Sequence, residues 1–245
     1  MYSINICHLY PELTNSYGDR GNIFVLKKRC EWRNIEVNIH NISIGDMFVL
    51  ENYDIVFFGS SQKHEKQIIL NDFIGTKCSA VKNAVEDNLV FLCIGGGYQI
   101  MGKKLVMSTD MELNCSGILD VTTVNSNKRL TGHLIFECSF LKNSRVVSFE
   151  NHSSKTYLGS DITPLGRVIH GYGNNGEDGS EGAIYKNVYC SYGHGSLLPR
   201  NPELADHLIT LALKRKYPDF IELTPLDDTL ENIAHHTIEK EYELS

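Results

Sequence analysis

The stretch Phe91-Leu-Cys-Ile-Gly-Gly-Gly-Tyr-Gln-Ile-Met-Gly-Lys-Lys104 gives the strongest indication of the fold. It contains the end of the continuous apolar run Leu89–Ile94, then three glycines, then a helical pattern. Continuous apolar runs of this length are typical of parallel strands that are covered on both faces. A strand, a tight glycine turn and a helix in this order therefore predict an α/β unit.

Alternating strand and helix patterns precede this stretch. Apolar spacing and turn residues predict strands at Ile4–Tyr10, Val37–Ile42 and Asp54–Gly59, and helices at Asn22–Trp32, Lys63–Asn71 and Ala80–Asn88. Asp19 precedes the first helix and is of a residue type favoured at helix N-caps. Strands that alternate with helices favour right-handed crossovers. We therefore predict an α/β fold with an open, mostly parallel sheet and flanking helices.

Short β-rich segments dominate the chain after residue 120. They are separated by Asn, Gly and Ser turns, and they comprise Val121–Val124, Leu134–Glu137, Arg145–Phe149, Arg167–Ile169 and Ala183–Tyr189. This spacing predicts antiparallel additions to the fold. A final helix is expected at Pro202–Lys216, because its last turn is basic and therefore complements the helix dipole.

The distribution of charge divides the chain into two parts. The 245 residues have a net charge of −7, and Pro218–Ser245 has eight acidic residues against the single base Lys240. The negative balance argues against a nucleic-acid binder, which requires a basic patch. We expect one domain over residues 1–217 and an acidic C-terminal tail over residues 218–245. Such a tail is either a solvated helix or arm, or a docking element for a partner.

Other patterns favour a cytoplasmic location without membrane insertion. The apolar runs are too short to cross a bilayer, and Met1–Tyr10 lacks the features of a secretory signal. The seven cysteines are scattered without a CxxC pair, which is typical of reduced thiols and does not indicate a zinc site. His152, His170 and the pair His235–His236 also lack metal-ligand spacing, so we expect no metal and no cofactor.

Three chemistries use a strand, a tight turn and a helix like those around Gly95–Gly97. Dinucleotide binding is disfavoured because Ile100 occupies the third glycine position of GxGxxG. A phosphate-binding loop is disfavoured because Lys104 replaces the Ser or Thr that holds magnesium. A nucleophile elbow places Ser or Cys at the apex of such a turn, where the helix N-terminus lowers a thiol pKa. A tight turn without chemistry is the simplest alternative.

Six motifs, in register between about residues 4 and 216, resemble the CobB/CobQ-like class I glutamine amidotransferases. The motifs are Ser16-Tyr-Gly-Asp-Arg-Gly-Asn22, Gly96-Gly-Tyr-Gln99, Arg129-Leu-Thr-Gly132, Phe149-Glu-Asn-His152, Gly171-Tyr-Gly-Asn-Asn175 and Gly193-His-Gly195. Within that family they look most like the GatD-like glutaminase subunits. The resemblance implies the class I glutamine amidotransferase fold, with a site at the carboxyl ends of the parallel strands.

The resemblance also implies a reaction and a partner. Members of the family hydrolyse glutamine with a cysteine nucleophile and a histidine base. In the GatD-like branch, the ammonia passes to a MurT-like, ATP-dependent Mur ligase that amidates the D-glutamate of lipid II in peptidoglycan synthesis. His194 matches the catalytic histidine, Asp19 the acidic residue proposed to complete the triad, and Arg129 the residue that holds glutamine. An arginine fork suits the α-carboxylate of a free amino acid.

The resemblance further implies a substrate pocket around the glycine turn. Gly96 and Gln99 belong to the matching motif, and Gly59 begins the loop Gly59-Ser-Ser-Gln-Lys-His64. We expect all three to bind substrate. The family has an Asp-Arg pair in the corresponding loop, whose backbone N–H groups help to form the oxyanion hole. Backbone donors survive a change of side chain, so the loop here is expected to keep that role.

The sequence departs from the family at the nucleophile, because Gly95 stands where the cysteine is expected. Cys93 lies two residues upstream, about 6.6 Å along a strand, and is expected to be a buried apolar thiol. Three accounts of Gly95 stay open: an engineered or trapped variant of an active glutaminase, a natural silent subunit that holds the partner while ammonia enters from solution, or catalysis by Cys93 after a register slip. A cobyric-acid-type amidotransferase is a further alternative, disfavoured because the fused synthetase domain expected there is absent from this sequence.

Overall fold

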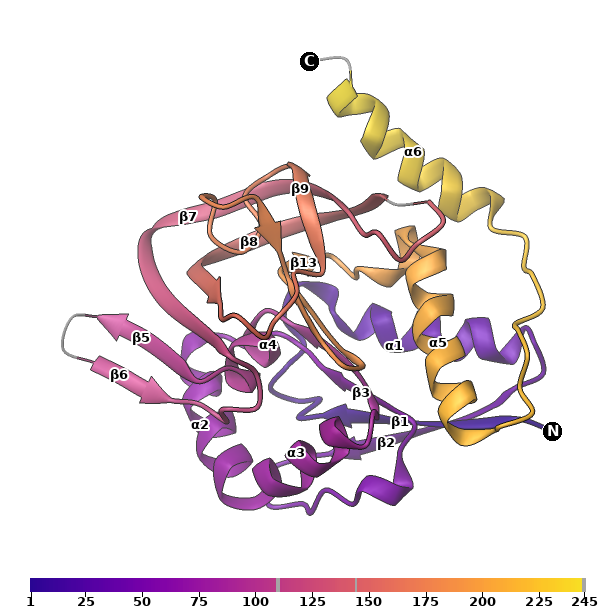
Figure 1. Cartoon of the computed structure of the whole chain (residues 1–245), viewed down its shortest axis with the longest axis horizontal. Coiled ribbons are helices and arrows are strands. Elements are labelled where there is room, and N and C mark those ends of the chain that lie inside the picture. Colours follow the sequence, from indigo (N-terminus) through magenta and orange to yellow (C-terminus); the bar gives the residue numbers. More distant parts are fainter. Residues whose placement is uncertain (109–110, 144, 244–245) are drawn as a thin grey trace.

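A six-stranded sheet forms the centre of the computed structural model, which describes residues 1–108, 111–143 and 145–243 (Figure 1). The strands follow the order β11-β12-β4-β3-β1-β2. Their bounds are Ser3–Leu9 (β1), Glu36–Ile42 (β2), Ile55–Phe58 (β3), Val90–Ile94 (β4), Ala183–Tyr185 (β11) and Val188–Ser191 (β12). The pairs from β12 to β2 are parallel, whereas β11 runs antiparallel to β12. The predicted mostly parallel sheet is therefore confirmed.

Helices cover both faces of this sheet. The longer ones are Arg20–Glu31 (α1), Lys63–Asp72 (α2), Cys78–Glu86 (α3), Gly96–Met101 (α4) and Pro202–Lys216 (α5), and the short turns are Ser16–Gly18 (η1), Leu50–Asn52 (η2), Phe73–Lys77 (η3) and Leu198–Arg200 (η4). Successive strand residues point to opposite faces. Ile6 therefore packs in the core with α1 and α5, and its neighbour Cys7 packs in the core with α2 and α3.

A second, largely antiparallel sheet follows the first half of the chain. Its strands are Lys104–Ser108 (β5), Met111–Asn114 (β6), Val121–Glu137 (β7), Arg145–Leu158 (β8), Gly166–His170 (β9), Ser180–Glu181 (β10) and Gly193–His194 (β13). The long pair of β7 and β8 forms its centre, and β13 pairs with β8. His194 is thereby placed opposite Phe149, so two motifs that are far apart in the sequence lie side by side.

Three of the predicted strand segments require correction. Val121–Val124 and Leu134–Glu137 are the two ends of one 17-residue strand, β7. The polar residues between them did not indicate a strand, but they pair or bulge along β8. Ala183–Tyr189 is divided by a turn into β11 and β12. β12 joins the main sheet parallel to β4 rather than forming an antiparallel addition.

The acidic C-terminal segment returns along the body of the protein. Phe220 is buried in the core that α1 and α5 share. Arg29 of α1 lies 2.6 Å from a carboxylate oxygen of Asp206 and 2.6 Å from one of Asp228. The last helix, Thr229–Glu243 (α6), then packs near η4 and β8. Figure 1 shows α6 in yellow, beyond the layers of the main sheet.

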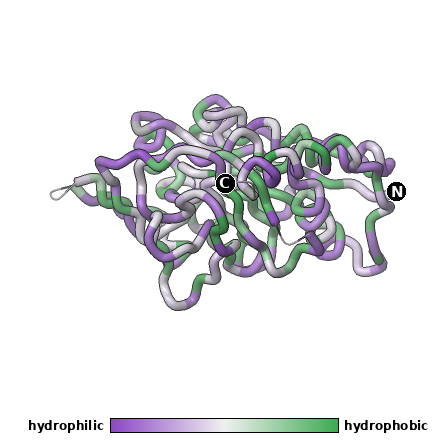
Figure 2. The backbone as a smooth tube through the Cα atoms, turned by 90° about the horizontal axis from the view of Figure 1, so that it is seen from above, coloured by the Kyte–Doolittle hydropathy of each residue, from purple (hydrophilic) through white to green (hydrophobic). Residues whose placement is uncertain are grey.

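Hydrophobic and hydrophilic stretches alternate over short distances along the chain (Figure 2). α5 and α6 each have 15 residues, whereas a membrane-spanning helix needs about 20 apolar residues. Within the described ranges, none of the helices combines the length and the apolar character that a membrane span requires.

Candidate active site

A cavity of about 450 Å³ opens at the carboxyl ends of the parallel strands. Ser60 follows β3, Gly95 follows β4, and His194 lies just beyond β12; all three line the cavity. Tyr17, in the turn between β1 and α1, lines it as well. Open parallel sheets bind ligands at this edge. The cavity therefore lies where the resemblance places the site.

Gly95 occupies the apex of a sharp turn between β4 and α4. Its φ is +49° and its ψ is −100°, a conformation that residues with a side chain rarely adopt. A Cβ atom added there would lie 2.8 Å from Cε1 and 3.1 Å from Nε2 of His194, and 2.6 Å from Oγ of Ser60. The turn thus has the shape of a nucleophile elbow, and a side chain at residue 95 would point at the imidazole.

The neighbouring glycines allow the loop after β3 to approach this turn closely. A Cβ atom on Gly96 would lie 2.8 Å from the backbone nitrogen of Ser61, and one on Gly59 would clash with the carbonyl oxygen of Thr14. Gly97 donates its N–H to the carbonyl oxygen of Gly59 at 3.1 Å. Gly59 therefore lies behind the wall of the cavity, which the next two residues form.

His194 and Asp19 meet beneath the elbow. Nδ1 of His194 lies 3.4 Å from Oδ1 of Asp19, and both side chains are buried. Oδ2 of Asp19 accepts the backbone N–H of Ser60 at 2.9 Å. Asp19 flanks the start of α1, but its side chain makes no capping hydrogen bond there. The carboxylate is thus used to orient the imidazole and the loop after β3, and Nε2 is the ring nitrogen that faces Gly95.

Arg129 lies on β7 and lines the cavity. Its Nε donates to Oδ1 of Asn151 at 2.6 Å, and one terminal nitrogen donates to the hydroxyl of Tyr17 at 3.2 Å. The ring of Tyr17 packs against the imidazole of His194, with centroids 4.8 Å apart. The three motifs that contain Arg129, Asn151 and Tyr17 are therefore joined in one wall, which presents a guanidinium to the cavity.

Gln99 lines the cavity, but both ends of its amide are already engaged. Its Nε2 donates to the hydroxyl of Tyr192 at 3.0 Å, and its Oε1 accepts a hydrogen bond from Lys66. The side chain is 3% exposed. Its present contacts make Gln99 part of the cavity floor, so a contact with substrate would need the bond with Lys66 or with Tyr192 to open.

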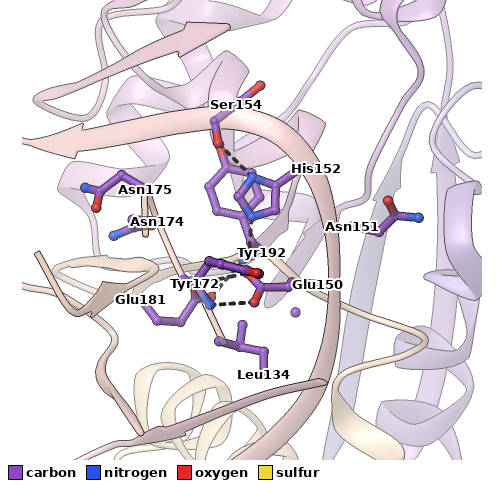
Figure 3. A network of polar contacts seen from close by, with 12 residues as sticks. Leu134, Glu150, Asn151, His152, Ser154, Tyr172, Asn174, Asn175, Glu181 and Tyr192 are labelled. Atoms are coloured by element: carbon purple, nitrogen blue, oxygen red, sulfur yellow. Dashed lines mark hydrogen bonds and ion pairs between the residues drawn. The ribbon is translucent and has the colours of Figure 1, made fainter. Parts of the chain in front are cut away.

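A buried polar network supports this floor (Figure 3). The imidazole of His152 stacks on the ring of Tyr192, with centroids 3.9 Å apart. Its Nδ1 lies 2.7 Å from the carbonyl oxygen of Ser154, and its Nε2 lies 3.4 Å from Glu150. The backbone N–H of Tyr192 donates to Glu181 at 2.8 Å. Burial raises the pKa of Glu181 to about 7.

Cys93 is placed away from the cavity. It is fully buried in the core that α2 and α3 cover. In the strand register it lies beside Cys190 of β12, and both cysteines are free thiols. The residue that reaches the cavity from this strand is Gly95, two positions further on. The geometry therefore gives no support to the account in which Cys93 acts after a register slip.

Sequence reasoning missed several residues that line the cavity. Tyr17 and His152 lie inside quoted motifs, so the motifs contained a signal that was not used for them. Ser60 and Ser61 belong to the loop Gly59–His64, from which only a backbone contribution was expected, and Lys66 lies outside every quoted motif. Oγ of Ser61 is buried and has no hydrogen-bond partner within the described part of the chain. It is therefore available to a ligand.

Comparison with known proteins gives a consistent picture. The chain matches the CobB/CobQ-like glutamine amidotransferase domain over residues 5–202. It is 40% identical over 231 residues to the lipid II isoglutaminyl synthase (glutamine-hydrolyzing) subunit GatD of Streptococcus pneumoniae, covering 94% of this chain and 88% of that protein. It is 38% identical over 216 residues to the GatD subunit of Staphylococcus aureus, covering 88% of this chain and 87% of that protein.

A likeness to solved structures supports the fold. The glutaminase domain of Trypanosoma brucei CTPS, solved with bound acivicin, matches with a TM-score of 0.55 at 10% identity. The match covers 90% of this chain and 98% of that one. The predicted fold class is thus confirmed. The domain match and the identity to the two GatD subunits show that the chain belongs to the CobB/CobQ-like glutamine amidotransferase family.

Proposed function

We propose that this chain is the glutamine amidotransferase subunit of a cytoplasmic lipid II isoglutaminyl synthase. Its partner is a MurT-like, ATP-dependent ligase subunit that amidates the D-glutamate of lipid II. The similarity to two GatD subunits over most of their length supports this role. The observation that carries it is the geometry of the elbow, where a Cβ atom at Gly95 would lie 3.1 Å from Nε2 of His194.

Glutamine fits the chemistry of the cavity. The guanidinium of Arg129 suits the α-carboxylate, and the carboxamide would then extend toward Gly95. The backbone N–H of Gly96 points at Oγ of Ser60 at the long distance of 3.3 Å, so it is available to an oxygen that becomes negative during reaction. In this proposal Arg129 binds the substrate, Gly96 stabilises the oxyanion, and Gln99 and Gly59 hold the walls in place.

A thiol at residue 95 would complete the reaction. The thiolate would attack the carboxamide carbon, and the imidazolium of His194 would protonate the departing nitrogen, which leaves as ammonia. Water would then hydrolyse the thioester to glutamate and restore the thiol. Asp19 would keep Nε2 of His194 directed at the sulfur throughout. Gly95 has no atom that can form the thioester, so residue 95 of this chain cannot take the covalent step.

The absence of a thiol at Gly95 favours a second candidate function, a subunit without glutaminase turnover. Such a subunit would hold the ligase in its active arrangement while free ammonia enters from solution. The two functions share the fold, the cavity and the partner. They differ in the nitrogen donor that the complex can use, and that difference can be measured.

The test compares nitrogen donors in the purified complex with the ligase. Because residue 95 of the unaltered chain has no thiol, we expect its complex to show the second function, with lipid II amidation from ammonium and not from glutamine. With Gly95→Cys, we expect amidation with both donors, while Gly95→Ala controls for the added Cβ and should use ammonium only. A folded Gly95→Cys complex that cannot use glutamine would refute the proposal. Glutamine use by the unaltered chain that disappears in Cys93→Ala would instead establish Cys93 as the nucleophile.

A further inference from the structure

The helix α6 carries a cluster of His235, His236 and Glu239 where it packs on the body of the protein. The three side chains line a cavity of about 250 Å³ together with Lys142, Asn143 and Arg145. His235 is buried, Glu239 is half-buried and His236 is exposed. The cluster is separate from the glutamine cavity, whose lining contains none of the six residues among those the structure describes. The spacing of the two histidines alone gives no indication of the cluster, because Glu239 joins them from the next turn of the helix.

The orientation of His235 is fixed by the main chain. Its Nδ1 lies 2.8 Å from the carbonyl oxygen of Arg200 in η4. A carbonyl oxygen can only accept, so Nδ1 carries the proton and donates it. In the neutral ring, Nε2 then has no proton and offers a lone pair. That nitrogen lies 3.7 Å from Oε1 of Glu239, which also presents lone pairs. A cation between the two atoms would bind a lone pair of each.

This arrangement is the usual one for a histidine that binds a metal ion. Metal-binding imidazoles almost always donate their other N–H to a carbonyl or carboxylate, which fixes the tautomer and the ring orientation. Here the carbonyl of Arg200 provides that contact to His235. The buried ring is therefore already oriented before any ion arrives, so binding would require little rearrangement on this side of the site.

The distances between donor atoms suit a small divalent ion. Nδ1 of His236 donates to Oε2 of Glu239 at 2.8 Å, and an ion would displace this proton. The nitrogen and oxygen atoms that the three residues offer to an ion lie within 4.8 Å of one another. Tetrahedral zinc with bonds of about 2.0–2.1 Å separates its ligands by about 3.3 Å. The separations of 2.8 and 3.7 Å lie on either side of that value. Imidazole nitrogen and carboxylate oxygen are both ordinary zinc ligands.

Nearby positive charge limits the affinity without closing the site. A terminal nitrogen of Arg145 lies 3.3 Å from Oε1 of Glu239, and Lys142 lines the same cavity. The side chain of Arg145 is 40% exposed, so solvent screens its charge at Glu239. The carboxylate also has lone pairs enough for both groups. We therefore expect weaker binding than at a closed structural zinc site.

We propose that His235, His236 and Glu239 form a binding site for a divalent transition-metal ion such as Zn²⁺. Nε2 of His235, Nδ1 of His236 and the carboxylate of Glu239 are the protein ligands, and water completes the shell. All three ligands lie on α6, and His235 also donates to the carbonyl oxygen of Arg200, so an ion that holds the ring of His235 strengthens the contact between α6 and η4. An ion that binds only the folded arrangement stabilises it in proportion to its concentration.

The test uses Co²⁺ and Zn²⁺ with the full-length chain. Bound Co²⁺ should give a visible absorption spectrum typical of nitrogen and oxygen ligands, without the thiolate-to-metal band that the half-buried Cys78 and Cys115 would produce. Calorimetry with Zn²⁺ should give one site per chain. The absence of a one-to-one Zn²⁺ site, or a Co²⁺ spectrum dominated by thiolate, would overturn the proposal.

Matched variants connect the binding to these side chains. His235→Asn and Glu239→Gln should each weaken Zn²⁺ binding at least tenfold. Two control variants remove an imidazole or a carboxylate outside the cluster: His40→Asn on exposed β2, and Glu231→Gln in the first turn of α6. Both should leave the affinity for Zn²⁺ unchanged. Zn²⁺ should also slow proteolysis between the body and α6 in the unaltered chain, and not in His235→Asn. Equal Zn²⁺ affinity in all four variants would contradict the assignment.

Discussion

Oδ1 of Asp19 lies 3.4 Å from Nδ1 of His194, although 175 positions separate the two residues along the chain. The other oxygen of the same carboxylate accepts the backbone N–H of Ser60. One buried side chain therefore fixes both the imidazole and the loop after β3. These are the two groups that lie closest to the missing side chain of Gly95.

Replacing Asp19 should affect stability in a graded way. Asp19→Ala leaves the buried N–H of Ser60 without its partner, which should lower the free energy of unfolding by about 2 kcal/mol. Asp19→Asn keeps an oxygen that can accept this bond and should cost less than half as much. Urea unfolding measures both values. Equal costs for the two variants would mean that the bond to Ser60 contributes little.

Arg129 should control the affinity for glutamine. Arg129→Lys keeps the charge but loses the fork that reaches Asn151 and suits a carboxylate. We expect the dissociation constant for glutamine to rise about tenfold, which is the effect of losing about 1.4 kcal/mol. Calorimetry on the unaltered chain and the variant measures the change. Arg167→Lys, an exposed arginine paired with Glu137, is the matched control. A similar loss in that control would argue against a specific contact.

Glu181 should make stability depend on pH. Burial raises its pKa from 4.5 to about 7, so the folded protein holds this proton more tightly than the unfolded chain does. The free energy of unfolding should therefore fall as pH rises from about 4.5 to about 7, by on the order of 3 kcal/mol. Glu181→Gln should remove this part of the dependence. Unfolding curves of both proteins between pH 5 and about 8 test it. Parallel pH profiles would contradict the assignment.

Gly95 should be a position where a side chain lowers stability. Its φ of +49° and the short Cβ contacts to His194 and Ser60 both disfavour a larger residue. Gly95→Ala should therefore lower the free energy of unfolding by about 1–3 kcal/mol. Gly75→Ala, in η3 with nothing within 4 Å of the added Cβ, is the control and should not destabilise the protein. An unchanged stability in Gly95→Ala would mean that the elbow relaxes without cost.

The sequence was sufficient for the four parallel strands β1 to β4 of the main sheet and for the helices between them. The apolar run before Gly95 and the alternating pattern of residues 1–105 gave strands and helices whose bounds agree within a few residues. Five of the quoted motifs supply residues that line one cavity, since Tyr17, Gln99, Arg129, His152 and His194 all belong to it. Motif order alone could bring these residues together because the resemblance supplied the topology.

Features that depend on tertiary packing were not predictable in this way. β12 is short, and only its pairing with β4 determines that it belongs to the parallel sheet. Gln99 was expected to contact substrate, but Lys66 and Tyr192 engage both ends of its amide. The cluster on α6 required knowledge that Arg200 orients His235. Each case depends on a contact between residues that are distant in the sequence.

Covalent labelling with a chloroketone analogue of glutamine tests the elbow geometry most directly. Gly95→Cys should take up one label per chain, and His194→Gln in that background should slow the reaction at least tenfold, because the imidazole no longer activates the thiol. The label should persist when Cys93→Ala is added. The unaltered chain, which keeps Cys93, should stay unlabelled. Labelling of the unaltered chain at the rate of Gly95→Cys, or a folded Gly95→Cys chain that does not react, would contradict the account.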